Sequence, residues 1–125
     1  MTNQIQGSNV KRNYDLAQRT SKFGSEIILF VKKIKENNIN KSIINQLIRS
    51  ATSIGANYME ADCAESKKDF IHKIGISKKE AKETTHWLRM LATAEPEVTE
   101  MCRRLWQEAH ELTLIFSAIV KRKYD

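Results

Sequence analysis

Apolar residues recur at every third or fourth position in four long segments of this sequence. Residues 16–34 follow the spacing 4-3-4-3-4, and closely similar alternations return in residues 44–61, 70–91 and 98–119. A period near 3.6 places such residues on one face of a helix that packs lengthwise against its neighbours. With one proline and four glycines in 125 residues, few positions would break the helices. The pattern predicts an all-α protein.

Short polar interruptions separate the four segments. Asn40 can cap the second helix, Ser66 followed by Asp69 is typical of a helix start, and Pro96 fits the first turn of the last helix. Connections this short make each helix antiparallel to the one before it. The sequence therefore predicts an antiparallel up-and-down four-helix bundle, with helices at about 14–37, 41–63, 67–94 and 97–122.

No internal repeat or linker divides the chain. Residues 1–12 are polar and aperiodic, and we expect them to form a flexible arm ahead of one bundle domain, residues 13–125. Small residues are densest in the second helix, where Gly55 indicates a close approach of another backbone. Two polar residues of the third apolar seam, Ser77 and Thr84, are small enough to bond the preceding turn of their own helix.

The stretch from Gln46 to Phe70 also resembles a known family. The residues that carry the resemblance are Arg49, Ala51, Ser53, Ile54, Asn57, Glu60 and Ser66-Lys67-Lys68-Asp69-Phe70. They are similar to the signature of four-helix bundle proteins, also called ribosomal protein S23-like proteins, which are encoded in intervening sequences of 23S ribosomal RNA genes. The similarity is good from about Tyr14 to Pro96 and weaker through the last helix.

The resemblance implies an all-helical up-and-down bundle without catalytic activity, often assembled as a ring of five subunits. The family's role is poorly defined, so the resemblance leaves the ligand open. It also makes Arg49, Asn57 and Glu60 part of a motif whose role is unknown.

Additional apolar residues flank each seam, and both tryptophans, Trp87 and Trp106, fall on these flanks. Such residues are either extra core or a contact between subunits, and tryptophan is enriched at interfaces. Together with the resemblance, the flanks predict a homo-oligomer, with Trp87 and Trp106 as candidate interface residues and a pentamer as the state that the family implies.

One pattern suggests a metal site. Glu83 and His86 match the Glu-x-x-His element that di-iron helix bundles use twice. The second copy is missing, because Gln107 stands three residues before His110 on the fourth helix. We expect no metal and no other cofactor.

The sequence also lacks the elements of nucleophilic catalysis. Neither Cys63 nor Cys102 has a histidine and an orienting group at a suggestive spacing, and the glycines form no phosphate-binding loop. Both thiols are expected to be reduced and partly buried. We expect a protein that is not an enzyme and has no small-molecule substrate.

The net charge of +6 is concentrated near the chain ends. Residues 11–35 hold seven basic against two acidic residues, whereas residues 60–83 are balanced at six and six. In an up-and-down bundle, the start of the first helix, the corner between the second and third helices and the end of the fourth share one pole. The basic residues expected at this pole are Lys11, Arg12, Lys67, Lys68, Lys121, Arg122 and Lys123.

A basic pole of this kind favours salt-dependent binding to the phosphates of RNA or another nucleic acid. The alternative is a homo-oligomeric scaffold that binds only proteins, with an ordinary solvated surface. No apolar run is long enough to cross a membrane, and no helix combines a strongly basic face with an unused apolar one. The sequence therefore predicts a cytoplasmic protein that does not bind membranes.

Overall fold

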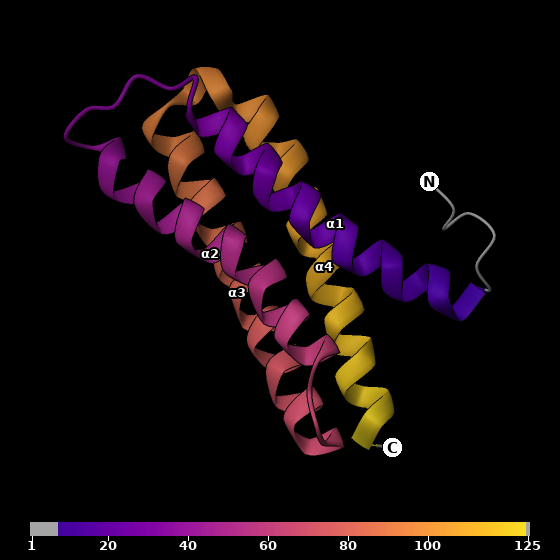
Figure 1. The fold of residues 1–125 in the computed structure, drawn as a ribbon. Helices are drawn as coiled ribbons and strands as arrows, with labels where there is room; N and C mark the ends of the chain where they lie inside the picture. Colours follow the sequence, from indigo (N-terminus) through magenta and orange to yellow (C-terminus); the bar gives the residue numbers. More distant parts are fainter. Residues whose placement is uncertain (1–7, 125) are drawn as a thin grey trace.

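The computed structural model describes the backbone of residues 8–124 and the side chains of residues 16–122. This part of the chain folds into four α-helices joined by short connections and contains no strand (Figure 1). The helices are α1 (Ser8–Val31), α2 (Asn40–Asp62), α3 (Lys67–Ala94) and α4 (Thr99–Tyr124), and a 3₁₀ turn, η2 (Pro96–Val98), precedes α4. The predicted antiparallel up-and-down bundle is confirmed.

The first helix differs most from its predicted bounds. It begins at Ser8 rather than near residue 14 and ends at Val31 rather than at residue 37. Beyond Val31 the chain tightens, because the N–H groups of Lys33 and Ile34 donate to carbonyls three residues earlier, at 3.1 and 3.0 Å. Residues 1–7 lie outside the described part of the chain, and their flexibility stays a prediction.

The side chain that caps the start of α2 belongs to Asn37 and not to Asn40 as we expected, since Asn40 is itself the first residue of the helix. Asn37 Oδ1 accepts hydrogen bonds from the backbone N–H groups of Ile39 and Asn40, at 2.9 and 2.8 Å. Asn40 Oδ1 accepts in return from Asn37 N–H at 3.0 Å. This reciprocal pair resembles a capping box, with asparagine at both positions. At α3 the expected cap is confirmed, since Ser66 Oγ accepts from Asp69 N–H at 3.0 Å.

The buried amide of Asn40 ties this connection to the far end of α3. Its Nδ2 donates to Lys35 O at 3.1 Å and to a carboxylate oxygen of Glu95 at 2.8 Å, and Asn37 Nδ2 donates to the same oxygen at 3.1 Å. The hydrogen bond from Asn40, followed by the one from Asn37, lowers the pKa of Glu95. The α1–α2 and α3–α4 connections are thus joined at one end of the bundle.

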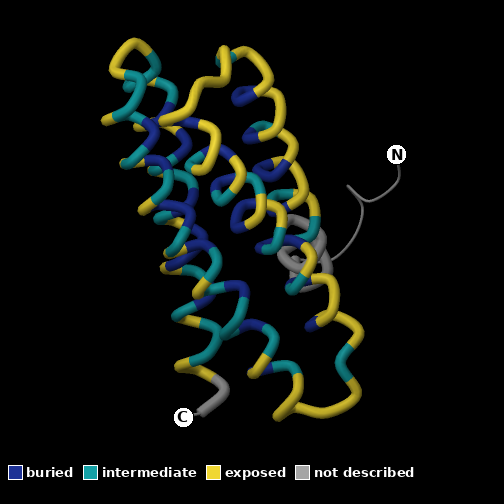
Figure 2. The backbone as a smooth tube through the Cα atoms, turned by 90° about the vertical axis from the view of Figure 1, so that its left-hand side faces the viewer, coloured by how far each residue is buried: buried dark blue, intermediate teal, exposed yellow. Residues whose placement is uncertain are grey.

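The predicted apolar seams form the core (Figure 2). Every seam residue of α2 is buried, and those of the other helices are buried except at helix ends. The side chains with no exposed surface include Ile27, Leu47, Ile54, Ile74, Ala81, Leu88, Leu91, Leu112 and Phe116. Burial of these side chains supplies the main stabilising term, of roughly 1.5–3 kcal/mol for each large one.

Small residues let α2 approach its neighbours closely. A Cβ at Gly55 would lie 3.2 Å from Thr20 Oγ1 on α1, which confirms the expected close approach. On the other side, Ser77 Oγ of α3 donates to Ile54 O of α2 at 3.0 Å. Ser77 therefore bonds the neighbouring helix and not its own preceding turn, contrary to expectation. Thr84 Oγ1 lies 2.8 Å from Glu80 O of its own helix, as expected, and 2.8 Å from Ser50 Oγ of α2.

The four helices are not packed equally on all sides. α2 packs extensively on α3, and α3 on α4, whereas α1 contacts α2 far more than α4. Two adjoining hollows of about 780 and 590 Å³ lie between α1 and α4 and share Glu26, Arg104 and Leu105 in their walls. The α1–α4 side is therefore the open side of the bundle.

Two glycines of the α1–α2 interface should respond differently to alanine. A Cβ at Gly24 would make ordinary contacts at 3.7 Å with Thr52, whereas one at Gly55 would press on Thr20. We expect Gly24→Ala to raise the free energy of unfolding by about 0.5–1 kcal/mol through helix propensity. In Gly55→Ala the close contact offsets this gain, so the variant should be no more stable than the wild type. Urea unfolding of both variants measures the difference, and a Gly55→Ala protein as stable as Gly24→Ala would contradict it.

Candidate nucleic-acid interface

The structure brings together only part of the predicted basic pole. Lys67 and Lys68 are exposed at the start of α3, and Lys121 and Arg122 are exposed near the end of α4. Both places lie at the same end of the bundle (Figures 1 and 2). The side chains of Lys11, Arg12 and Lys123 lie outside those that the structure describes.

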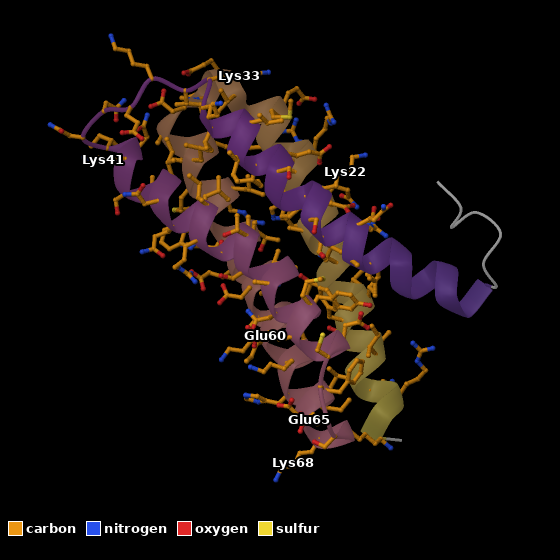
Figure 3. The ribbon with its side chains drawn as sticks, in the orientation of Figure 1. Lys22, Lys33, Lys41, Glu60, Glu65 and Lys68 are labelled. Atoms are coloured by element: carbon orange, nitrogen blue, oxygen red, sulfur yellow. The ribbon has the colours of Figure 1, made fainter. Side chains whose placement is uncertain are left out.

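Acidic residues share this end with the lysines. Glu60, Glu65 and Lys68 all lie toward the α2–α3 corner, while Lys33 and Lys41 lie toward the opposite end (Figure 3). Glu60 is engaged by an ion pair, because Lys73 Nζ lies 2.7 Å from its Oε1. The pole is therefore of mixed charge in its described part.

A more uniform basic surface runs along the outer face of α3. Six exposed side chains recur there at the spacing of one helical face, opposite the buried seam. They are Lys68, His72, Lys79, Lys82, His86 and Arg89. Gly75 is the remaining position between Lys68 and Arg89 on this face, so no acidic residue interrupts it. We call these six residues the basic face of α3; at 1.5 Å per residue it is about 30 Å long.

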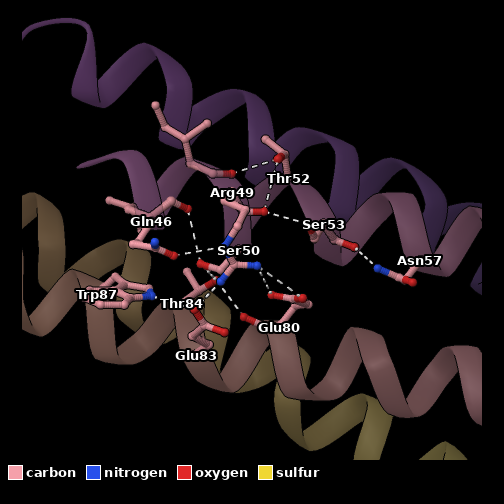
Figure 4. A network of polar contacts seen from close by, with 12 residues as sticks. Gln46, Arg49, Ser50, Thr52, Ser53, Asn57, Glu80, Glu83, Thr84 and Trp87 are labelled. Carbon is pink, nitrogen blue, oxygen red and sulfur yellow. Dashed lines mark hydrogen bonds and ion pairs between the residues drawn. The ribbon is translucent and has the colours of Figure 1, made fainter. Parts of the chain in front are cut away.

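The acidic residues in the middle of α3 turn away from the basic face. Glu80 and Glu83 lie on the side of α3 that packs against α2, and both bind Arg49 (Figure 4). Arg49 Nη1 lies 3.2 Å from Glu80 Oε1, Arg49 Nη2 pairs with Glu83, and Arg49 Nε donates to Gln46 Oε1 at 3.0 Å. A balanced count of charges along the sequence therefore conceals an unbalanced distribution around the helix.

The indole of Trp87 completes this network. Its Nε1–H donates to Glu83 Oε2 at 2.8 Å, and its ring meets His86 edge-on with the centroids 4.8 Å apart. The hydrogen bond from Trp87, together with Arg49, lowers the pKa of Glu83. The same interaction with Glu83 raises the pKa of Arg49. Glu83 thus connects Arg49 of α2 with the indole of Trp87 on α3.

The motif residues of unknown role have structural contacts. Arg49 and Glu60 each join α2 to α3 through ion pairs. Asn57 Nδ2 donates to Ser53 O at 2.9 Å on its own helix. The resemblance alone identified these three residues, and the contacts indicate that two of them fix how α2 and α3 lie against each other.

The other candidate residues are placed as follows. Trp87 and Trp106 are both half-buried, on α3 and α4. Both cysteines are free, but only Cys102 is buried, so the expectation of partial burial is wrong for the exposed Cys63. Burial raises the pKa of the Cys102 thiol to about 11.

Two features are absent from the described residues. Among them, no group of three or more histidine, cysteine, aspartate or glutamate side chains could hold a metal ion. Within the same part of the chain, no helix is both long and apolar enough to cross a bilayer.

Sequence reasoning missed Lys79, Lys82, His86 and Arg89. The sequence does contain the pattern, because these residues recur at helical spacing on the same face as Lys68 and His72. Counting charges in linear windows did not detect it, whereas the exposure of each position in α3 does.

The described residues define a small antiparallel four-helix bundle protein with a basic face on its third helix. The chain belongs to the family of the 23S rRNA-intervening sequence protein, whose sequence profile matches residues 12–118. The family suggested by the resemblance is confirmed.

A solved structure is similar to this chain. It is the crystal structure, at 1.70 Å resolution, of a protein with unknown function from the S23 ribosomal protein family of Bacteroides thetaiotaomicron VPI-5482. The two sequences are 33% identical, the match covers 85% of this chain and 98% of that one, and the TM-score is 0.75. No curated protein matches the chain at a significant level.

The stabilisation that Glu83 provides should depend on pH. In the folded protein the pKa of Glu83 is lowered from 4.5, its value in the unfolded chain. Ionised Glu83 therefore contributes its full share to the free energy of unfolding above the unfolded pKa, and this share is lost as the pH falls through the folded pKa. We expect Glu83→Gln to destabilise the protein by about 0.5–1 kcal/mol at neutral pH. The difference from wild type should shrink in acid, measured by thermal unfolding over a pH series.

Glu100→Gln, which removes an exposed carboxylate from α4, controls for the loss of one negative charge. A difference between Glu83→Gln and wild type that grows as the pH falls would contradict the role assigned to Glu83.

Proposed function

We propose that this protein is a non-catalytic nucleic-acid-binding protein that contacts phosphates through the basic face of α3. The observation that carries the proposal is the run of Lys68, Lys79, Lys82 and Arg89 on one exposed helix face. None of these four side chains forms an ion pair with a described residue. They are therefore available to an external anion.

The form of the surface favours an extended polyanion over a small anion. The basic face is about 30 Å long and straight, because it follows one helix. Its charges lie at separate levels of α3 rather than around one pocket. Phosphate contacts of this kind are strongly salt-dependent and largely independent of sequence. The family name, which refers to an intervening sequence of 23S rRNA, makes RNA the first nucleic acid to test.

We also propose that the protein forms a homo-oligomer, and that the exposed surface of α1 contacts the next subunit. Apolar side chains are exposed on both sides of α1: Leu29 is 58% exposed toward α4, whereas Ile28 (39%) and Met59 of α2 (52%) line a groove between α1 and α2. Leu29 lines the open hollow between α1 and α4. Neither tryptophan is as exposed as these residues, so they are weaker candidates for the interface than α1.

The two surfaces are compatible. α3 packs on α2 and α4, whereas α1 and α3 lie diagonally across the bundle. A second copy docked on the α1 side would leave the basic face of α3 open, and an oligomer would present several such faces. Weak phosphate contacts would then add through multivalency. The state that the family implies is a pentamer, and the alternative function is a protein scaffold with the same assembly but no affinity for nucleic acid.

The first experiment measures RNA binding across a salt series. We expect the double variant Lys79→Gln, Lys82→Gln to bind RNA more weakly. A plot of the logarithm of the association constant against the logarithm of the salt concentration should also be less steep, by about one unit of slope for each lysine. Lys32→Gln with Lys33→Gln is the matched control, since it removes the same charge from an exposed segment outside the basic face. Lys121→Gln with Arg122→Gln tests the predicted pole in the same way.

Three results are informative. Loss of binding only in the α3 pair supports the proposal, whereas equal losses in all three pairs would show that net charge and not the basic face matters. No binding by the wild type at low salt would reject nucleic-acid binding and favour the scaffold.

The second experiment is sedimentation equilibrium at micromolar concentration. We expect the wild type to be larger than a monomer, and Leu29→Glu to shift it toward the monomer because a charge in an apolar contact is costly to bury. Leu114→Glu makes the same change at a residue of similar exposure, 55%, on α4. A monomeric wild type would refute the oligomer. Dissociation by Leu114→Glu but not by Leu29→Glu would place the interface elsewhere.

A further inference from the structure

The two tryptophans have different surroundings. Trp87 Nε1–H is bonded to Glu83, whereas Trp106 Nε1–H has no hydrogen-bond partner among the described residues. No buried side-chain nitrogen or oxygen in the described part lacks a partner, so this N–H reaches the surface. The indole of Trp106 also stacks on His110, with centroids 4.9 Å apart and planes 14° apart. His110 thus supports one face of an indole that solvent can reach.

Trp106 forms one wall of a hollow between α3 and α4. The hollow has a volume of about 390 Å³, within the range of small-molecule sites. Ala92 is half-buried in its wall, and the buried residues Leu88 and Cys102 lie beneath it. The combination of an indole with aliphatic groups suits a flat, apolar surface.

Polar side chains also line this hollow. They are Arg89, Arg103 and Gln107, and all three are exposed. Arg103 pairs with Glu100, whereas Arg89 has no ion-pair partner among the described residues. Arg89 is also the last residue of the basic face of α3, so this face leads directly to the hollow.

We infer that the α3–α4 hollow is a stacking site for an unpaired nucleobase, with Trp106 as the stacking surface. This inference rests on the proposed nucleic-acid binding and names its ligand class: RNA or DNA with single-stranded nucleotides. A nucleobase has apolar faces and hydrogen-bonding edges, which match the indole and the polar lining. Arg89 sits where the phosphate next to the stacked base would lie. A base held in a regular duplex cannot enter, because its faces are covered by its neighbours.

The chain's two tryptophans allow this site to be observed directly. Trp87→Phe leaves Trp106 as the single indole, and Trp106→Phe leaves Trp87. We expect unpaired RNA to quench the fluorescence of the Trp87→Phe protein, because stacking on a base quenches an indole. The Trp106→Phe protein should change little, and a blunt duplex of the same composition should quench neither.

A separate measurement tests affinity. Removing a stacking side chain costs about 1–3 kcal/mol per base, so Trp106→Leu should weaken binding of unpaired RNA about five- to 150-fold. Binding of the duplex, which depends on phosphate contacts alone, should change less than twofold. Far-ultraviolet circular dichroism checks that the Trp106→Leu protein is folded. If this variant does not fold, the fluorescence of the Trp87→Phe protein decides whether a base stacks on Trp106.

The outcomes separate the two proposals. If RNA binds but Trp106 is not quenched and single strands bind no better than duplex, the stacking site is wrong and the phosphate-binding function stands. If neither form of RNA binds at low salt, the proposed function itself fails. If adenosine monophosphate alone quenches Trp106 at the same concentration as RNA, the hollow is a mononucleotide site and the inference is overturned.

Discussion

The hydrogen bond from Ser77 Oγ to Ile54 O fixes the level at which α3 lies against α2. It is buried and joins a side chain directly to a neighbouring backbone, so sliding the helices would leave a buried polar group unpaired, at a cost of about 1–3 kcal/mol. The contact between Thr84 and Ser50 repeats the constraint two turns further along. At this level Glu80 and Glu83 meet Arg49, and the charges on the outer face of α3 are left entirely basic. A buried neutral contact thereby determines an exposed electrostatic surface.

The two sides of the molecule differ for a related reason. α2 and α3 are held together by hydroxyl groups, ion pairs and small residues, and α4 packs fully on α3. α1 is attached mainly to α2, where Gly55 allows close contact with Thr20. The open α1–α4 side contains its own salt bridges, because Arg19 pairs with Glu108 at 2.7 Å and with Glu111 at 2.8 Å. This arrangement gives the bundle a closely packed side, which carries the basic face of α3, and a more open side between α1 and α4.

The sequence predicted the helices and their core well because both depend on local periodicity, as the burial of Leu47, Ile54 and Leu88 illustrates. It placed the end of α1 six residues too late, because residues 32–36 contain no glycine or proline to mark the end of a helix. It also mistook the cap of α2, since Asn37 and Asn40 can each cap a helix and only their reciprocal bonding shows which one does. The partner of Ser77 could not be predicted, because it depends on how two helices are set against each other. The basic face of α3 could have been found on a helical projection, but the engagement of Glu80 and Glu83 by Arg49 required the fold.

The contrast between the two cysteines has a practical consequence. Cys102 is buried, and its thiol has a pKa of about 11, so little of it is in the nucleophilic thiolate form at neutral pH. Cys63 is exposed at the corner between α2 and α3. A maleimide dye would therefore attach selectively to the unaltered chain, close to where the basic face of α3 begins. The protein therefore carries its own attachment point for a fluorescent probe, and the proposed assembly and nucleic-acid binding can be tested by distance measurements without engineering a cysteine.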